Sequence, residues 1–475
     1  MKIEVINSQV YGNPYQKLLY TAIDARYQIV SGTLSKAIKR QQATECSIYH
    51  IHWEESLFSR CTTVAQAARV RREYVKQLRD YIAIGGKVVW TLHNIKPHEW
   101  RFVRTLLSLR KDIAELSHRI LVHNQTALSV LQEQTGLVDL SKVTVLPHPA
   151  YFDVYESVDR TIERAGRPAA NPRTLLCFGL VRAYKGIPDL LRKLPQDFMV
   201  QHQLALHICG KPLRADSFLN DLLAQGSERP EITYTLTSIP VEEVAELFRS
   251  NAGLILPYHR VLTSGVAVLA LTLGVPTIAP NTPAMRELFP ESSHHLLFEP
   301  RSPKDLRRAV VALADMPGEI REQIAEDYIQ QALLYHPQRV SGALGAIYDE
   351  LIGLAGDNCW IRLWGRRPAM LDDVAAQSRV PFLLQLISGN RSMATRVSKA
   401  AAVALSNQQL ALELVKATLV GNVRTGASDE LILNNIKDVN TLTVERSRLD
   451  AAYAVRLYTN ILNRLEQWSA GQDEK

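Results

Sequence analysis

The chain has 475 residues, of which 46% are hydrophobic and 22% are charged, and its formal net charge is +7. This composition is that of a soluble globular protein and argues against a disordered or fibrous chain, while the length predicts about three domains. The five cysteines lie far apart and form no C-x-x-C pair. Their spacing argues against a disulfide framework or a zinc site and favours a reducing compartment.

Neither a secretory signal nor a membrane span is predicted. A charge at Glu4 interrupts the first strand-like run, and the longest apolar stretch, residues 265–280, is shorter than the roughly 20 residues that a span requires. We therefore expect a cytoplasmic protein. Residues 1–150 contain 20 Lys and Arg against 12 Asp and Glu. Their excess charge lies in helical-looking segments, 69–79 and 101–119, which form either an ordinary solvated surface or a face that attracts phosphates, nucleic acid or anionic lipid.

Short apolar runs alternate with longer amphipathic stretches through the first 350 residues, which predicts βαβ units and parallel sheets. The first set of predicted strands is Ile3–Ile6, Ile48–His52, Lys87–Leu92, Arg119–His123 and Val143–Leu146. A polar stretch with linker composition follows at residues 156–173. The alternation of predicted strands and helices then resumes, and the second set of predicted strands is Thr174–Phe178, Leu204–Cys209, Ile232–Leu236, Gly253–Leu256 and Pro276–Ala279.

This order predicts two Rossmann-like halves, residues 1–155 and 174–353, that face a cleft. Ligands bind outside the carboxyl ends of the strands in such sheets. From about residue 356 the sequence changes to Ala-, Leu- and Val-rich periodic segments. They predict a mostly helical extension over residues 356–475, without an assignable motif, for which packing or oligomerisation is the simplest role.

Two loops of the second half have the residues of a phosphate site. Gly179 permits a turn at the end of a strand, and Arg182 and Lys185 then place two cations before a helix. Further along, the sequence Thr263-Ser264-Gly265 opens an apolar helix and offers hydroxyl and backbone N–H groups. Either loop alone is also typical of a solvated turn or an N-cap. Because both follow strands of one sheet, together they favour a diphosphate ligand.

These stretches resemble the donor half of GT-B glycosyltransferases of the retaining family four. The resemblance is carried by Lys185-Gly186 and by a helix that closes with Gly274-Val275-Pro276, and it extends over residues 1–353. Glu287 stands where that family commonly has a glutamate. The resemblance, together with the two loops, implies as donor-binding residues Gly179, Arg182, Lys185, Tyr258, Thr263, Ser264, Gly265 and Glu287.

The chain departs from that family at three positions. The family's Glu-x7-Glu pair is replaced by Val261 and Leu269, and its arginine after the loop glycine is replaced by Leu180, with Arg182 as a substitute. This pattern resembles a subgroup similar to exopolysaccharide mannosyltransferases, with Thr-Ser-Gly in place of the first glutamate. Recognition of the ribose and the identity of the donor are the features that these departures leave open.

The first half offers polar residues at the ends of several predicted strands. By the resemblance, His93 lies in the cleft near the donor sugar, where its imidazole would act in catalysis with Arg182 and Lys185; otherwise it caps the following segment. The acidic pair in His52-Trp53-Glu54-Glu55 binds acceptor hydroxyls or acts as a base. The predicted acceptor-binding residues are Tyr11, Gly12, Asn13, His52, Glu54 and Asn94. Asn124, Gln125 and His148 complete the polar rim.

These features predict a glycosyltransferase that moves a hexose from a GDP- or UDP-linked donor to a glycan or a lipid-linked acceptor in cell-surface or exopolysaccharide assembly. No cofactor and no metal are expected, because Arg182, Lys185 and the Ser264–Gly265 turn would neutralise the leaving diphosphate. The resemblance implies retention of configuration. The basic first half predicts peripheral contact with an anionic membrane at its inner face rather than binding of nucleic acid.

Other interpretations remain open at this point. A nucleotide-sugar epimerase has the same architecture but needs groups that move a proton at the sugar ring, and the missing glutamate pair weakens that interpretation. The same absence permits a catalytically inactive GT-B subunit that acts as a binding or scaffold partner. Nucleic-acid binding would appear as an affinity that falls steeply with salt and does not respond to nucleotide sugars.

Overall fold

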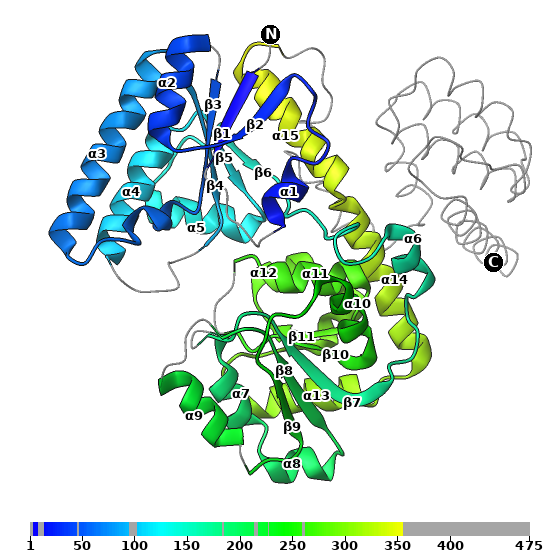
Figure 1. Ribbon diagram of the computed structural model, residues 1–475. Coiled ribbons are helices and arrows are strands. Elements are labelled where there is room, and N and C mark those ends of the chain that lie inside the picture. The colour runs from blue at the N-terminus through cyan, green and yellow to red at the C-terminus, as the bar shows by residue number, and fades with distance from the viewer. Residues whose placement is uncertain are drawn as a thin grey trace, which may run out of the picture. The chain divides into compact units, whose positions relative to one another are not determined.

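The computed structural model describes residues 3–7, 14–44, 47–94, 102–182, 185–212, 217–226, 228–258 and 262–354. These residues form two α/β halves, each built on a six-stranded parallel sheet (Figure 1). The predicted pair of Rossmann-like halves is therefore confirmed. Two predicted features lie outside the described residues: the acceptor loop with Tyr11, Gly12 and Asn13, and the helical extension at 356–475.

The sheet of the first half has the strand order β2-β1-β3-β4-β5-β6. All its strand pairs are parallel, so each strand is followed by a crossover that returns the chain to the same edge. The elements of this half are β1 Ile3–Asn7, α1 Tyr15–Leu19, β2 Tyr27–Ser31, α2 Leu34–Thr44, β3 Ser47–His52, the 3-10 helix η1 Glu54–Phe58, α3 Val64–Ala83, β4 Lys87–Leu92, α4 Val103–Leu116, β5 Arg119–Val122, α5 Gln125–Thr135 and β6 Val143–Val145.

Successive side chains of the central strands enter two different cores. In β4, Val88 and Trp90 pack with residues of α2, α3 and α4 on one face of the sheet. Val89, between them, packs on the other face against α1 and the last helix of the second half. Because both faces are covered, the strand reads as one continuous apolar run rather than as an alternating one. Its polar residues are consequently confined to the end of the strand, where the loops begin.

The second half has the strand order β12-β11-β10-β7-β8-β9. Its strand order reverses between the central strands β7 and β10, and such a switch point is where open α/β sheets bind their ligands. The elements of this half are α6 Val158–Glu163, β7 Asn171–Phe178, α7 Ile187–Lys193, α8 Gln196–Gln201, β8 Ala205–Cys209, α9 Ser217–Gly226, β9 Ile232–Thr235, α10 Val241–Ser250, β10 Asn251–Ile255, α11 Gly265–Leu273, β11 Thr277–Pro280, α12 Pro283–Leu288, η3 Glu291–Leu296, β12 Leu297–Phe298, α13 Pro303–Ala314, α14 Gly318–Leu334 and α15 Pro337–Leu351.

The boundary between the halves differs from the predicted one. Residues 150–152 already pack in the core of the second half, although they were expected in the first. Conversely, α15 follows the second half in sequence but packs on the first sheet beside α1 (Figure 1). The predicted linker contains the helix α6, and Glu156 anchors it through ion pairs with Arg164 and Arg249. It is therefore an ordered connection.

In the part of the chain that the structure describes, no helix combines the length and the apolar character needed to cross a membrane.

Candidate functional site

The loop after β7 holds a buried lysine against a glycine. Gly179 has φ of +106°, a conformation that favours glycine, and a β-carbon at this position would lie 2.8 Å from the Nζ atom of Lys185. Lys185 is only 9% exposed, and its Nζ lies 5.7 Å from the centre of the Tyr258 ring. The predicted residues Gly179, Lys185 and Tyr258 are thus brought together at the switch point of the second sheet.

The cations of this loop have few partners. Burial, together with the nearby charge of Arg182, lowers the pKa of Lys185 to about 8. Among the described residues, no carboxylate pairs with Lys185, and none accepts a hydrogen bond from the buried Nε atom of Arg182. A buried cation without a counter-charge is costly, so this loop is suited to an anionic ligand.

The loop after β10 ends in the predicted Thr-Ser-Gly turn. Ser264 is buried and is the N-cap of α11, where its Oγ accepts a hydrogen bond from the amide of Ala267 at 3.2 Å. The first turn of the helix still leaves backbone N–H groups without intrahelical acceptors. A β-carbon at Gly265 would lie 2.6 Å from the hydroxyl of Tyr151. Glycine is therefore required there for close packing, as well as for any approach of a phosphate.

The same turn contacts the first half. The side-chain amide of Asn124 donates to the carbonyl of Leu262 at 2.7 Å, and Leu262 packs in the core of the first half. The amide also lies 3.5 Å from the hydroxyl of Thr263. Glu287 on α12 accepts the backbone N–H of Gln125 at the start of α5, at 3.0 Å from each oxygen. Thr263 and Glu287, both predicted to bind the donor, therefore help to join the two halves.

Four histidines surround the ring of Tyr15 at the carboxyl edge of the first sheet, and a fifth, His50, lies against His52 with 4.0 Å between ring centres. Hydrogen bonds connect three of the five. The hydroxyl of Tyr20 bonds to Nδ1 of His50 at 3.0 Å and to Nε2 of His52 at 3.1 Å, and Nδ1 of His52 bonds to Nε2 of His93 at 3.0 Å. We call this set the histidine cluster: His50, His52, His93, His123 and His148.

The histidine cluster is uncharged near neutral pH. Burial lowers the pKa of His50 to about 3 and that of His123 to about 4. Burial, together with the neighbouring histidines, holds the pKa of His52 and His93 well below the ordinary value. In the described part of the chain, no group of three His, Cys, Asp or Glu is arranged to hold a metal ion. The cluster therefore offers neutral hydrogen-bonding groups.

The turn after β3 places the side chains of two adjacent glutamates, Glu54 and Glu55, in different surroundings. Glu54 is buried in the core, where its carboxylate pairs with Arg110 at 2.6 Å and accepts from the indole of Trp90 at 3.2 Å. This placement corrects the prediction that Glu54 binds the acceptor. Its neighbour Glu55 instead accepts from the side-chain amide of Asn94 at 2.6 Å. The predicted residue Asn94 thus contacts Glu55, and its neighbour His93 stacks on Trp53 with 4.2 Å between ring centres.

The sequence placed Tyr15 in the expected acceptor loop, whereas two other aromatic residues of this site, Tyr151 and Tyr348, were missed. Tyr15 forms the centre of the histidine cluster, and Tyr151 contacts the Gly265 turn. Tyr348 on α15 reaches His50 with its hydroxyl 2.6 Å from Nδ1. The position of Tyr151, three residues after the predicted rim residue His148, was an available signal. The sequence contains no such signal for Tyr348, because almost 300 residues separate it from His50.

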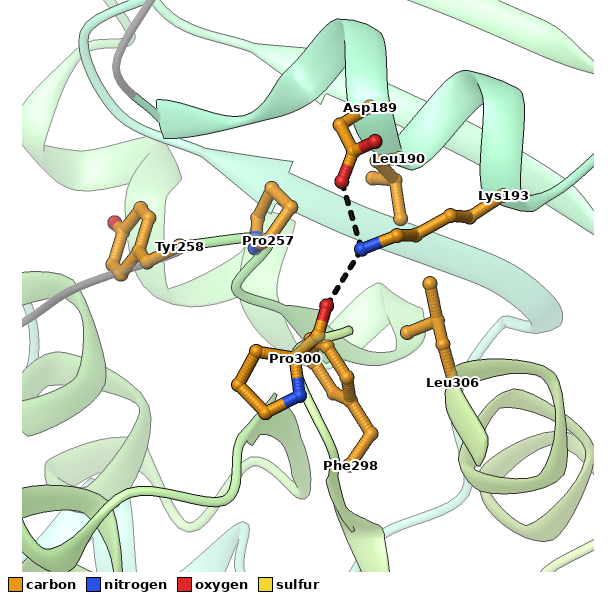
Figure 2. A pocket seen from close by; sticks show the side chains of 8 residues that line it. All are labelled: Asp189, Leu190, Lys193, Pro257, Tyr258, Phe298, Pro300 and Leu306. Atoms are coloured by element: carbon orange, nitrogen blue, oxygen red, sulfur yellow. Dashed lines mark hydrogen bonds and ion pairs between the residues drawn. The ribbon is translucent and has the colours of Figure 1, made fainter. Parts of the chain in front are cut away.

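A small pocket lies behind Tyr258 in the second half. Figure 2 shows its lining, Asp189, Leu190, Lys193, Pro257, Tyr258, Phe298, Pro300 and Leu306. The Nζ atom of Lys193 lies between Asp189 and the carbonyl of Pro300, at 2.7 Å from each. This lysine is therefore fully engaged within the protein, in contrast to Lys185.

Comparison with known proteins agrees with this geometry. Residues 172–316 match the family model described as "Glycosyl transferases group 1". A GDP-mannose:glycolipid 4-beta-D-mannosyltransferase of Xanthomonas campestris pv. campestris is 29% identical over 269 residues, which are 56% of this chain and 70% of that protein. Residues 172–316 of the second half are therefore similar to group 1 glycosyl transferases.

Solved structures agree on the fold. A UDP-forming α,α-trehalose-phosphate synthase from Burkholderia vietnamiensis is 12% identical, with a TM-score of 0.53, and covers 74% of this chain and 100% of its own. Anabaena HepE in complex with UDP is 14% identical, with a TM-score of 0.51 and the same coverage. At these identities the likeness concerns the fold, which is the GT-B arrangement of two parallel α/β domains.

Proposed function

We propose that this protein is a glycosyltransferase that moves a hexose from a nucleotide-sugar donor to a glycan or lipid-linked acceptor in cell-surface or exopolysaccharide assembly. The observation that carries the proposal is the cation site at the switch point of the second sheet. Lys185 is buried there without a carboxylate partner among the described residues. The buried Nε atom of Arg182 has no hydrogen-bond acceptor among them either. A diphosphate would supply the missing negative charge.

The chemistry follows from where charge develops. As the bond between the sugar and the diphosphate breaks, negative charge accumulates on the leaving group, and cations already in place stabilise it without reorganisation. Lys185 and Arg182 take this role in our proposal, and the amide groups at the start of α11 add to it. The reaction then needs neither a metal ion nor another cofactor.

The donor that we propose is GDP-mannose, and a UDP-linked sugar is the second candidate. The first choice is supported by the name of the Xanthomonas relative, which specifies GDP-mannose and a glycolipid. The second is supported by the HepE structure, which contains UDP. Direct competition between GDP and UDP for the site distinguishes the two donors.

On stereochemistry, the sequence resemblance predicts retention, whereas the name of the relative specifies a β-linked product. The mannose of GDP-mannose is α-linked, so a β-mannoside requires inversion. We propose inversion, because Val261 and Leu269 replace the glutamate pair of the retaining family. The anomeric configuration of the first-formed product, measured by NMR, decides between the two outcomes.

For the acceptor we propose a lipid-linked glycan at the inner face of the membrane. Support comes from α3, whose exposed side includes the four cations Arg69, Arg72, Lys76 and Arg79. Each such residue near an anionic leaflet adds about 1 kcal/mol to binding. Part of the predicted basic charge is not available for this purpose, since Arg110 is buried against Glu54.

The experiment that tests the donor site is thermal unfolding of the purified protein with a panel of nucleotide sugars. A ligand at 100 times its Kd adds about 2.7 kcal/mol to the stability of the folded state. We expect stabilisation by one nucleotide sugar in the wild type and in Lys193→Ala, and none in Lys185→Ala. Lys193 is the matched control because its charge is already paired with Asp189. Absence of any shift in the wild type would refute the donor site, and binding without turnover would favour the inactive subunit.

A further inference from the structure

The chain makes a strained turn at the switch point of the first sheet. The strand order reverses between β1 and β3, and β3 ends directly before Trp53. Trp53 has φ of +48°, a left-handed conformation that is uncommon for residues other than glycine. Such a backbone persists only where its surroundings hold it, and it is concentrated at functional sites. The two glutamates that follow are turned in different directions.

Glu54 and Arg110 form the fixed part of this turn. Both side chains are almost completely buried, with 1% and 0% exposure, and the ion pair joins the Nε of Arg110 to the Glu54 carboxylate. The indole of Trp90 gives the same carboxylate a second donor. Glu54 therefore holds the turn to β4 and α4, and both of its oxygens are engaged within the protein.

Glu55 differs from Glu54 in its partners. One oxygen accepts from the side-chain amide of Asn94, whereas Oε2 is buried and has no hydrogen-bond donor among the described residues. Asn94 follows His93 directly, and His93 stacks on Trp53. Through Asn94, the carboxyl group of Glu55 is connected to the segment after β4 that carries His93. An unpaired buried acceptor is costly for folding, so its presence indicates a functional partner.

We infer that Glu55 is the general base that removes the proton from the acceptor hydroxyl, and that Asn94 is its positioning residue. The inference rests on the proposed transferase function and extends it. Oε2 of Glu55 takes the hydroxyl proton as the acceptor oxygen forms its bond to C1 of the sugar. The bond from C1 to the diphosphate breaks, and the diphosphate leaves with the electron pair. The proton is then released to solvent.

The electrostatic environment fits this role. Burial and the charge of Glu54 raise the pKa of Glu55 to about 7, while the Asn94 hydrogen bond and the charge of Arg110 act in the opposite direction. Glu54 in the same turn and Arg110 on α4 are the charged residues that act on it. A base with a pKa near the working pH is the most effective, because it is available in its basic form and still holds the proton well.

The test uses the full-length protein with GDP-mannose and measures release of GDP. The acceptors are synthetic alkyl glycosides, and water replaces them if none is glycosylated, because hydrolysis also requires a proton to leave the attacking oxygen. Glu55→Gln should lower kcat 10²- to 10⁴-fold while stabilisation by GDP-mannose is unchanged. Glu133→Gln is the control, since Glu133 lies exposed on α5.

Two further readouts separate a base from a structural residue. In the wild type, the rate should fall as the pH drops through about 7, and this acid limb should be absent in Glu55→Gln. Asn94→Ala should move the limb to higher pH, because the lost hydrogen bond favours the ionised carboxylate. Added formate should restore part of the activity of Glu55→Ala by acting as a replacement base.

The possible results distinguish failure of the inference from failure of the proposed function. Normal kcat and an unchanged pH profile in Glu55→Gln, or absence of formate rescue in a folded Glu55→Ala that still binds GDP-mannose, would overturn the inference and leave the transferase function intact. A wild type that neither binds nor turns over any nucleotide sugar would overturn the proposed function, and the inference with it.

Discussion

Replacing Lys185 by Met should make the protein without its ligand more stable. Burial lowers the pKa of Lys185 from 10.5 to about 8, and each pKa unit corresponds to 1.36 kcal/mol between the two protonation states. The protonated lysine therefore costs the folded state on the order of 3 kcal/mol at pH 7. Met keeps an unbranched apolar chain of similar length without the charge. We expect Lys185→Met to gain up to about 3 kcal/mol in unfolding free energy and to lose stabilisation by nucleotide sugars.

The pH dependence has a definite sign. Below pH 8 the lysine is protonated in both the folded and the unfolded chain, so the folded wild type carries the full cost. Between pH 8 and 10.5 the unfolded chain binds the proton and the folded chain does not, so the wild type gains stability relative to the variant as the pH rises. Above 10.5 the electrostatic difference disappears.

Urea unfolding of both proteins at pH 7 and pH 9.5 measures this effect. Lys193→Met is the control and should lose stability at both values, because it removes the bonds to Asp189 and to the Pro300 carbonyl. If Lys185→Met were less stable than the wild type by the same amount at both pH values, Lys185 would have a satisfied partner in the free protein. The reasoning that leads from its burial to an anion site would then be refuted.

Three further predictions concern the glycine turn, the buried ion pair and the metal. Gly265→Ala should weaken nucleotide-sugar binding at least tenfold, because its β-carbon would lie 2.6 Å from the Tyr151 hydroxyl. The control is Gly342→Ala, which has open space around it on α15 and should leave binding unchanged while adding about 0.5–1 kcal/mol of stability. Calorimetry measures both the binding and the stability. Glu54→Gln should lower the unfolding free energy by about 3–5 kcal/mol by removing the counter-charge of the buried Arg110, and similar urea midpoints for variant and wild type would contradict this. Turnover should continue in excess EDTA, and its loss with recovery on adding Mg²⁺ would show that a metal takes part.

Much of the fold could be predicted because both sheets are buried on two faces. Strands of that kind form uninterrupted apolar runs, as in β4 and β10, and these are visible in the sequence. Tyr27–Ser31 was missed because Gln28 and Ser31 interrupt its apolar run, and four of its five residues are partly buried or exposed. Leu297–Phe298 was missed because two residues give no periodic pattern.

The site was predicted unevenly for a similar reason. Gly179 and Lys185 are six residues apart and belong to one loop, so the sequence shows their proximity directly. Glu54 and Glu55 show the limit of prediction from sequence, because the two residues are adjacent and chemically identical. Their opposite environments depend on the left-handed turn at Trp53 and on Arg110 from another helix. Neither the turn nor the partner has a local signal, and the assignment of Glu54 to the acceptor was wrong for that reason.

The two candidate sites differ in charge in a way that fits a transferase. Departure of a diphosphate leaves negative charge on the leaving group and positive charge on the sugar ring. Cations stabilise the first and oppose the second. Lys185 and Arg182 stand at the switch point of the second sheet, where our proposal places the diphosphate. The histidines of the first half stay neutral, because each is buried and several lie close together, so that protonating one disfavours protonating the next. A positively charged cluster would repel the developing sugar cation, whereas in our proposal neutral imidazoles would bind its hydroxyl groups without that cost.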